Sequence, residues 1–237
     1  MNAGNSGVRA QYFVGGFGHT GGVERPERAI FETVRRQPDE LCKCVDLLKS
    51  VHDADGYPIS WPADPVRWLA PPKQIAAWVA KGTTRNVRGH VALHAVANHA
   101  ARDIWTASSR VQSERLMVLS RLIVSPEHRR TGLAEALVTA ATRYAHHHGA
   151  LPVLDVAQDN VAAICLYEKL GWHRVGDLEI SSSRTIPVFA YLGPVPENAS
   201  ALLSGEPAQH GEHFAYSGKL SPSYCRGKRE QPGRCEQ

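Results

Sequence analysis

A single stretch near the middle of the sequence, residues 116–149, limits the possible folds more than any other part of the chain. Leu116–Val124 is almost entirely apolar, as expected of a buried strand, and Pro126 ends the run. A helix is predicted over residues 133–148, because apolar side chains recur on one helical face and Gly149 follows. That face consists of Leu133, Leu137, Ala141 and Tyr144. A strand joined by a short loop to an amphipathic helix indicates an α/β protein.

The rest of the middle region also alternates between strand and helix patterns. Strands are predicted over residues 30–34, 74–80, 90–96, 152–156, 172–175 and 186–192, and helices over residues 41–51, 66–69 and 161–170. Residues 97–115 are assigned to no element. The order of these elements predicts a mixed α/β sheet.

The two ends of the chain differ from this middle region in composition. Residues 1–25 are rich in glycine, and residues 194–237 are rich in proline and polar residues. We therefore expect a flexible leader and a flexible tail around one domain of residues 26–193. With 43% hydrophobic and 21% charged residues, the chain can form a packed core.

Charge and targeting patterns argue against several kinds of partner. The net charge of +4 is too small to indicate nucleic-acid binding. No run of about 18 apolar residues predicts a membrane span, and the first residues lack a signal-peptide pattern. The five cysteines are scattered, which does not indicate a disulfide framework. We expect a cytoplasmic monomer or homodimer that binds neither nucleic acid nor membrane.

The loop that leads into the helix at residues 133–148 has the composition of an anion site. A helix N-terminus presents unpaired N–H groups and a partial positive charge, which suit a phosphate. Gly132 lets a ligand approach the backbone, and Ala134 keeps the next turn small. Arg129 and Arg130 add positive charge. Taken alone, the loop fits equally well a tight connection with a solvated basic pair.

A second segment, residues 154–172, places polar residues on an apolar strand and helix. Asp155 points away from Leu154 and Val156 in an otherwise apolar strand. Asn160 stands where the next helix begins, which is the position of an N-cap residue. Tyr167 follows two helical turns later, so Asn160 and Tyr167 share a helix face.

Together these two segments resemble a known family. The pattern Arg129-x-x-Gly132-x-Ala134 resembles the acyl-CoA loop of the GNAT superfamily of N-acetyltransferases. The pattern Asn160-x-x-Ala163-x-x-Leu166-Tyr167-x-x-Leu170-Gly171-Trp172 resembles the second signature of the superfamily. The resemblance implies the acyl-CoA N-acyltransferase (GNAT) fold, with a mixed, mostly antiparallel central sheet flanked by helices. The Asp-Gly-Tyr-Pro run at residues 55–58 also resembles bacterial, actinobacteria-like members.

The resemblance implies acetyl-CoA as the cosubstrate, with no metal. The pantetheine arm is expected on the main chain of Leu122, Ile123 and Val124, and Asn160 is expected to bond the arm or a neighbouring carbonyl. The pyrophosphate is expected on the N–H groups of Arg129, Arg130, Thr131, Gly132, Leu133, Ala134 and Glu135. Three adjacent histidines at residues 146–148 splay around their helix and are not expected to share a metal ion.

Two residues are predicted to assist the chemistry. An alkyl ammonium must lose a proton before the amine attacks a thioester, and Asp155 is the expected base, directly or through water. Some peptide-acetylating members of the family carry a Glu at the matching position. Tyr167 is expected near the sulfur, where its hydroxyl can protonate the departing thiolate. Alternatively, Asp155 is a structural partner of Arg121 or Arg174, and Tyr167 is only a core aromatic residue.

The loop at residues 53–72 is expected to form one wall of the acceptor site. It holds Asp53, Asp55, Tyr57 and Trp61, and carboxylates beside aromatic rings suit a cationic or aromatic amine. A loop that merely packs on the sheet is the alternative. The predicted function is acetyl-CoA-dependent acetylation of a primary amine of a small molecule. The alternatives are a protein or peptide N-acetyltransferase and a non-catalytic acyl-CoA-binding sensor domain.

Overall fold

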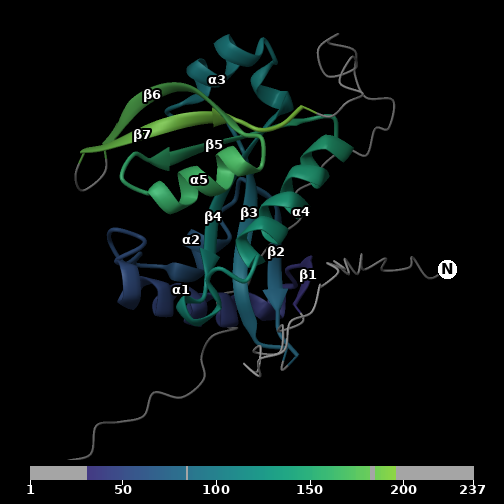
Figure 1. Ribbon diagram of the computed structural model, residues 1–237, viewed down its shortest axis with the longest axis vertical. Coiled ribbons are helices and arrows are strands. Elements are labelled where there is room, and N and C mark those ends of the chain that lie inside the picture. The colour runs from purple at the N-terminus through teal and green to yellow at the C-terminus, as the bar shows by residue number, and fades with distance from the viewer. Residues whose placement is uncertain (1–30, 84, 182–184, 196–237) are drawn as a thin grey trace, which may run out of the picture. The chain divides into compact units, whose positions relative to one another are not determined.

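Seven strands of the described residues form one central sheet (Figure 1). The computed structural model describes residues 31–83, 85–181 and 185–195. The strands are β1 (Glu32–Arg35), β2 (Gln74–Lys81), β3 (Val87–Ala95), β4 (Leu116–Val124), β5 (Leu151–Ala157), β6 (His173–Ser181) and β7 (Thr185–Leu192). Their order is β1-β2-β3-β4-β5-β7-β6, and every neighbouring pair is antiparallel except β4 and β5. The mixed, mostly antiparallel sheet expected from the sequence is therefore confirmed.

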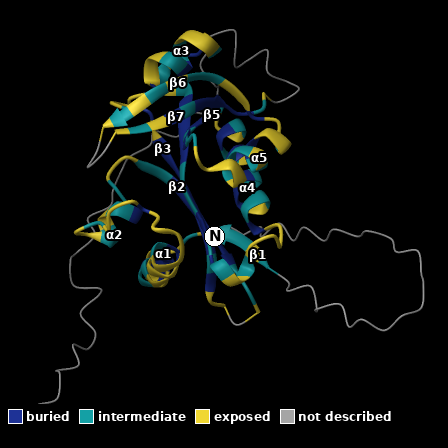
Figure 2. Ribbon diagram, turned by 60° about the vertical axis from the view of Figure 1, so that its left-hand side comes forward, coloured by how far each residue is buried: buried dark blue, intermediate teal, exposed yellow. Residues whose placement is uncertain are grey.

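Helices cover both faces of this sheet. They are α1 (Leu41–Asp55), α2 (Pro65–Leu69), α3 (Arg102–Ser109), α4 (Leu133–His147) and α5 (Val161–Lys169). Figure 2 shows α1 and α2 on one side of the sheet and α4 and α5 on the other. The third helix packs on β6 and β7. No helix in the described part of the chain is long and apolar enough to cross a membrane.

Side-chain alternation along the strands sorts the core into two layers. In β2, Trp78 packs in the layer that contains α4, whereas Val79 packs in the layer that contains α1. In β5, Leu154 joins the α4 layer, whereas Val153 packs with residues of α3. Because Asp155 follows Leu154, it lies on the face of α1 and α3, opposite to α4.

The structure extends the predicted elements. The strand expected at residues 172–175 continues to Ser181 as β6. Residues 97–115, which were assigned to no element, contain α3, whose Trp105 is fully buried. The predicted leader, residues 1–25, lies outside the described residues. The same holds for the predicted tail, apart from Pro194 and Val195.

One cysteine of α1 lies in the core. Cys44 is buried and free, and burial raises the pKa of its thiol to about 12.

Candidate active site

The two parallel strands at the centre of the sheet separate along their length. Pairing between β4 and β5 covers only Leu116 to Val118 on β4 and Leu151 to Val153 on β5. Each strand continues beyond this point, β4 to Val124 and β5 to Ala157. The β5-facing edge of β4 therefore has main-chain groups that no strand pairs in the described residues. The predicted pantetheine-binding residues, 122–124, lie in this open length.

A β-bulge marks the start of the open length. His90 pairs with Ile123, and Ala92 pairs with Ser120, so β4 has one residue more than β3 between these pairs. Within the bulge, Arg121 has a left-handed φ of 54°. The Arg121 guanidinium carbon lies 4.8 Å from the ring centroid of Trp68. The bulge thus aims a cationic side chain at the face that carries α1 and α2.

The N-terminus of α4 lies at the far end of the open strand. Gly132 has a φ of 87°, and a Cβ at this position would meet no atom within 4 Å. Its carbonyl accepts the N–H of Ala136, at 3.0 Å. The N–H groups of the first helical turn cannot be paired within the helix, so they remain available to an anion. The helix therefore begins where the sequence predicted, and binding of the pyrophosphate by residues 129–135 stays a prediction.

The side chains of this loop have partners that the sequence did not indicate. The Arg129 guanidinium pairs with both carboxylate oxygens of Asp55 at the end of α1, with one N–O distance of 2.9 Å. The Thr131 hydroxyl donates to the carbonyl of His128, at 2.6 Å. Glu135 pairs with Lys169 of α5, at 2.7 Å. Arg129 therefore ties the loop to α1 instead of standing free beside the helix terminus.

The second signature places Asn160 and Tyr167 as expected on α5. The Asn160 side chain accepts the N–H of Ala163 at 3.1 Å, so it caps the helix. Tyr167 is buried and packs 5.8 Å from Trp172, measured between ring centroids. Burial raises the pKa of the Tyr167 hydroxyl, and the nearby Tyr57 and Asp155 raise it further. The hydroxyl therefore keeps its proton at neutral pH.

Asp155 is held by a histidine that the sequence analysis missed. Its Oδ1 lies 3.1 Å from Nε2 of His99, while Nδ1 of His99 accepts the N–H of Ala101 at 3.2 Å. Because Nδ1 is an acceptor, the partners assign the proton to Nε2, which donates to Asp155. The His99 ring also contacts Trp105 of α3, with 4.7 Å between the ring centroids and the planes tilted by 39°. Both residues lie in the segment that was assigned to no element, so only the fold brings them to Asp155.

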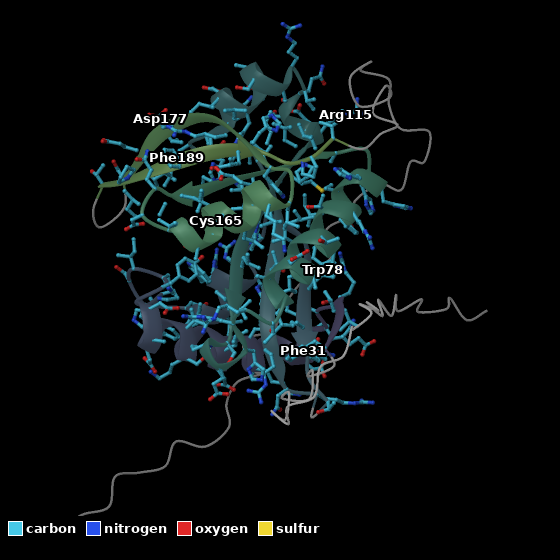
Figure 3. All side chains as sticks on the ribbon, viewed as in Figure 1. Phe31, Trp78, Arg115, Cys165, Asp177 and Phe189 are labelled. Carbon is cyan, nitrogen blue, oxygen red and sulfur yellow. The ribbon has the colours of Figure 1, made fainter. Side chains whose placement is uncertain are left out.

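The alternative partners proposed for Asp155 are wrong. Arg174 lies over the ring of Phe189, 3.6 Å from its centroid, and pairs with Asp177 at 3.4 Å. Figure 3 labels Asp177 and Phe189 together on β6 and β7. Arg121 also pairs elsewhere, since its Nη1 lies 2.7 Å from Nε2 of His94. Of the three candidates, only His99 contacts the Asp155 carboxylate.

The predicted acceptor wall separates into two parts. Asp53 pairs with Lys49 at 3.0 Å, and Asp55 pairs with Arg129, so both carboxylates already have cationic partners. Tyr57 and Trp61 are each 39% exposed. The Tyr57 ring lies 6.1 Å from Trp68, and the Trp61 ring lies 5.3 Å from His52. The two aspartates are therefore engaged in ion pairs, whereas Tyr57 and Trp61 keep exposed ring surface.

The Tyr57 hydroxyl feels the charges of residues on β4 and β5. Its enclosure raises the pKa to about 12, an effect that the Arg121 charge opposes and the Asp155 charge reinforces. Tyr57 in turn raises the pKa of Tyr167. Tyr57 is therefore influenced by both Arg121 and Asp155, and Tyr167 by both Tyr57 and Asp155. Sequence reasoning considered Arg121 only as a structural partner.

A cavity elsewhere in the molecule does not include these residues. It has a volume of about 470 Å³ and lies between α1, residues 86–88 and residues 125–127. Its lining has both signs of charge, with Lys43 and Arg88 facing Asp46 and Glu127. In the described residues, no group of three or more His, Cys, Asp or Glu side chains is arranged to hold a metal ion.

Comparisons with known proteins identify the family and the fold. Residues 45–172 match the model of the acetyltransferase (GNAT) family. No curated protein matches the chain. Among solved structures, the ribosomal-protein-S18-alanine N-acetyltransferase from Escherichia coli is 15% identical, with a TM-score of 0.50 over 71% of this chain and 97% of that one.

Two further structures contain acetyl-CoA. Arabidopsis thaliana NAA60 in complex with acetyl-CoA is 17% identical, with a TM-score of 0.53 over 68% of this chain and 98% of that one. The acetyltransferase yncA from Salmonella typhimurium, with its cofactor acetyl-CoA, is 13% identical, with a TM-score of 0.51 over 68% and 92%. At these identities, the likeness is one of fold.

Proposed function

Because the chain belongs to the GNAT family of N-acetyltransferases, we propose that it transfers an acetyl group from acetyl-CoA to the primary amine of a small molecule. The observation that carries the proposal is the separation of β4 from β5 beyond Val118 and Val153, beside the N-terminus of α4. This separation provides unpaired main-chain groups and an anion-accepting helix end in one place. Two of the similar structures are complexes with acetyl-CoA, which supports the choice of donor.

The residues along the open strand fit such a donor. The main chain of Leu122, Ile123 and Val124 would hold the pantetheine arm, and the first turn of α4 would hold the pyrophosphate. The space in front of Gly132 is open, as the empty surroundings of a Cβ there indicate. Bound acetyl-CoA would supply the acetyl group as a thioester.

Asp155 receives the proton that the acceptor's ammonium group must lose. His99 donates to Oδ1, which leaves Oδ2 for the amine or for an intervening water. Both ring nitrogens of His99 are engaged, Nε2 by Asp155 and Nδ1 by the N–H of Ala101. We therefore assign His99 as a positioning residue for Asp155.

Tyr167 holds a proton on the opposite side of the open strand. It belongs to the α4 layer of the core, whereas Asp155 faces the α1 and α3 side. Because burial keeps the hydroxyl protonated, Tyr167 can donate to a thiolate sulfur at neutral pH. One group that accepts a proton and one that donates it therefore lie on opposite faces of the same opening.

The aromatic loop between α1 and α2 supports a small acceptor. The loop carries the half-exposed rings of Tyr57 and Trp61, and His52 anchors it through Nδ1, 2.9 Å from the carbonyl oxygen of Pro58. The alternative, a protein or peptide acceptor, is favoured by the E. coli relative, which is an alanine N-acetyltransferase of a ribosomal protein. A short peptide in the substrate panel separates the two.

The test is thiol release from acetyl-CoA with amino acids, polyamines, aromatic amines and short peptides as acceptors. Tyr167→Phe should lower turnover roughly 10²-fold or more, which is typical of a lost acid catalyst. Tyr191→Phe is the matched control, because its hydroxyl donates to Glu168 at 3.0 Å. Equal activity of the two variants would contradict the role of Tyr167. Acetyl-CoA binding without turnover on any acceptor would favour a non-catalytic sensor domain.

A further inference from the structure

Arg121 has a partly buried charge that no carboxylate of the described residues neutralises. Its guanidinium forms no ion pair with any carboxylate of the described residues. Nη1 donates to Nε2 of His94 at 2.7 Å and approaches the Ser120 hydroxyl at 3.4 Å. Nε is a buried donor that has no partner. Most of the hydrogen-bonding capacity of this guanidinium is therefore unused.

The groups around Arg121 cannot supply the missing negative charge. His94 is neutral, because burial and the Arg121 charge lower its pKa to about 3. The Tyr57 hydroxyl keeps its proton, because its pKa is about 12. Trp68 offers only the face of its ring, at 4.8 Å. An unpaired, partly buried cation is costly, so an external anion at this point would stabilise the protein.

Arg36 shows that this fold can satisfy a buried arginine internally. Its Nη1 donates to the carbonyl of Leu69 at 3.1 Å and to Nε2 of His90 at 3.0 Å. Its Nη2 donates to the Gln74 side chain at 2.7 Å. The negative charge of Glu40 also acts on it. Arg121 also packs against a histidine of β3, but it has no counterpart of the Leu69 carbonyl, the Gln74 side chain or Glu40 among the described residues.

The position of Arg121 relates it to the acceptor. The side chain lies in the β4 bulge, at the start of the open strand, and its charge acts on the Tyr57 hydroxyl. Asp155 acts on that same hydroxyl from β5. Arg121 on β4 contacts Trp68 of α2, and Asp155 on β5 contacts His99 beside α3, so both side chains lie on the same face of the two strands where these separate. A cationic group and an anionic group thus border the same opening. Such a pair complements a molecule that has an ammonium and a carboxylate close together.

We propose that Arg121 binds a carboxylate of the acceptor, so that the acceptor is an amino acid, with its ammonium group at Asp155. This proposal rests on the proposed acetyltransferase function and names the substrate class. It differs from the cationic acceptor expected from the sequence, because Asp53 and Asp55 already have cationic partners. A bidentate pair between guanidinium and carboxylate would use the donors that the protein leaves unpaired.

The experiment compares L-amino acids with their primary amides, which differ only in the carboxylate. Wild-type protein should acetylate the preferred acid with a kcat/KM at least roughly 10-fold above that of its amide, and calorimetry without acetyl-CoA should give the same order of Kd. Arg121→Gln should lose roughly 10- to 100-fold on the acid and little on the amide. Arg121→Lys, which keeps the charge without the planar fork, should retain part of the preference.

Each other outcome leads to a definite conclusion. Amides that equal or exceed acids in wild-type protein would overturn the proposal while leaving acetyltransfer intact. A preference for acids that survives in Arg121→Gln would overturn it too, because the carboxylate would then bind elsewhere. If no amine is acetylated, the proposed function fails, and the calorimetric comparison still decides whether Arg121 recognises a carboxylate. If Arg121→Gln does not fold, the proposal is tested by the ratio of kcat/KM for acid and amide in wild-type protein and by the same ratio in Arg121→Lys.

Discussion

Arg36 and Arg121 each bond a histidine of β3, but only Arg36 has a full set of hydrogen-bond acceptors. Arg36 donates to Nε2 of His90, and Arg121 donates to Nε2 of His94, four residues further along β3. In both histidines Nδ1 faces an oxygen, the carbonyl of Arg121 for His90 and the Ser120 hydroxyl for His94. The two pairs therefore share one tautomer and one orientation. Only Arg36 has further acceptors on each of its Nη atoms.

Burial alone therefore does not identify a functional arginine. Both guanidinium groups are buried enough to have a lowered pKa, with burial as the largest cause. The distinction comes from counting donors against acceptors. Arg36 holds β1, α2 and β2 together through side-chain and main-chain acceptors, whereas Arg121 keeps free donors beside the open strand.

The strongest predicted effect is on the pH dependence of stability, through the histidine of each pair. The pKa of both His90 and His94 is lowered to about 3, below the value of about 6.5 in an unfolded chain. Because the unfolded state binds more protons, the free energy of unfolding should fall as the pH drops from about 6.5 toward 3. His94→Gln should reduce this slope by roughly 1.4 kcal/mol per pH unit, and so should His90→Gln.

Urea unfolding at pH 7 and pH 5 measures these slopes. If both variants reduce the slope of the free energy of unfolding against pH by the same amount, the two histidines are equivalent. The two pairs then differ only in their arginines. A slope that neither variant changes would contradict the neutral state assigned to both rings.

The next effect separates the arginines by stability. Arg36→Gln should lower the free energy of unfolding by on the order of 3 kcal/mol, because it leaves several buried acceptors without donors. Arg121→Gln should cost less than about 1 kcal/mol, since the lost bond to His94 is offset by removal of an uncompensated charge. Chemical denaturation of the two variants at pH 7 provides the values. Similar losses of stability in both variants would contradict the view that the protein satisfies Arg36 but not Arg121.

A smaller effect is expected at the wall first assigned to the acceptor. Asp53→Asn removes an exposed ion pair with Lys49 and should change stability by less than about 0.5 kcal/mol. It should also leave KM for the acceptor unchanged, because Asp53 already has a cationic partner. Steady-state kinetics with the preferred acceptor checks this. A KM raised several-fold would return Asp53 to the acceptor site.

The fold was predictable where a short segment carries its own pattern. The helix bounds of α4 and α5 follow from apolar spacing and from Asn160 and Gly149, and the sequence placed both helices within a residue or two. The open edge beside them also follows from the family signatures, which lie on these elements. Neither prediction needed knowledge of distant contacts.

The acceptor side could not be predicted in this way, because it depends on pairings across the sheet. His99 meets Asp155 from a segment that no pattern assigned, and the bulge that aims Arg121 appears only in the register of β3 against β4. Similarly, Asp55 appeared available from the sequence, although it pairs with Arg129, 74 residues away. Partners so far apart in sequence leave no local signal, so the charge balance of the site required the structure.

The most direct measurement is the shift in thermal unfolding temperature that a saturating amino-acid acceptor causes in wild-type protein, Arg36→Gln and Arg121→Gln. A ligand that binds only the folded state raises this temperature in proportion to its binding free energy. With the acceptor at about 100 times its wild-type Kd, we predict closely similar shifts in wild-type protein and Arg36→Gln, and a shift of about half or less in Arg121→Gln. An equal shift in Arg121→Gln would contradict the account, because the acceptor's carboxylate would then not be held by the arginine that the fold leaves unpaired.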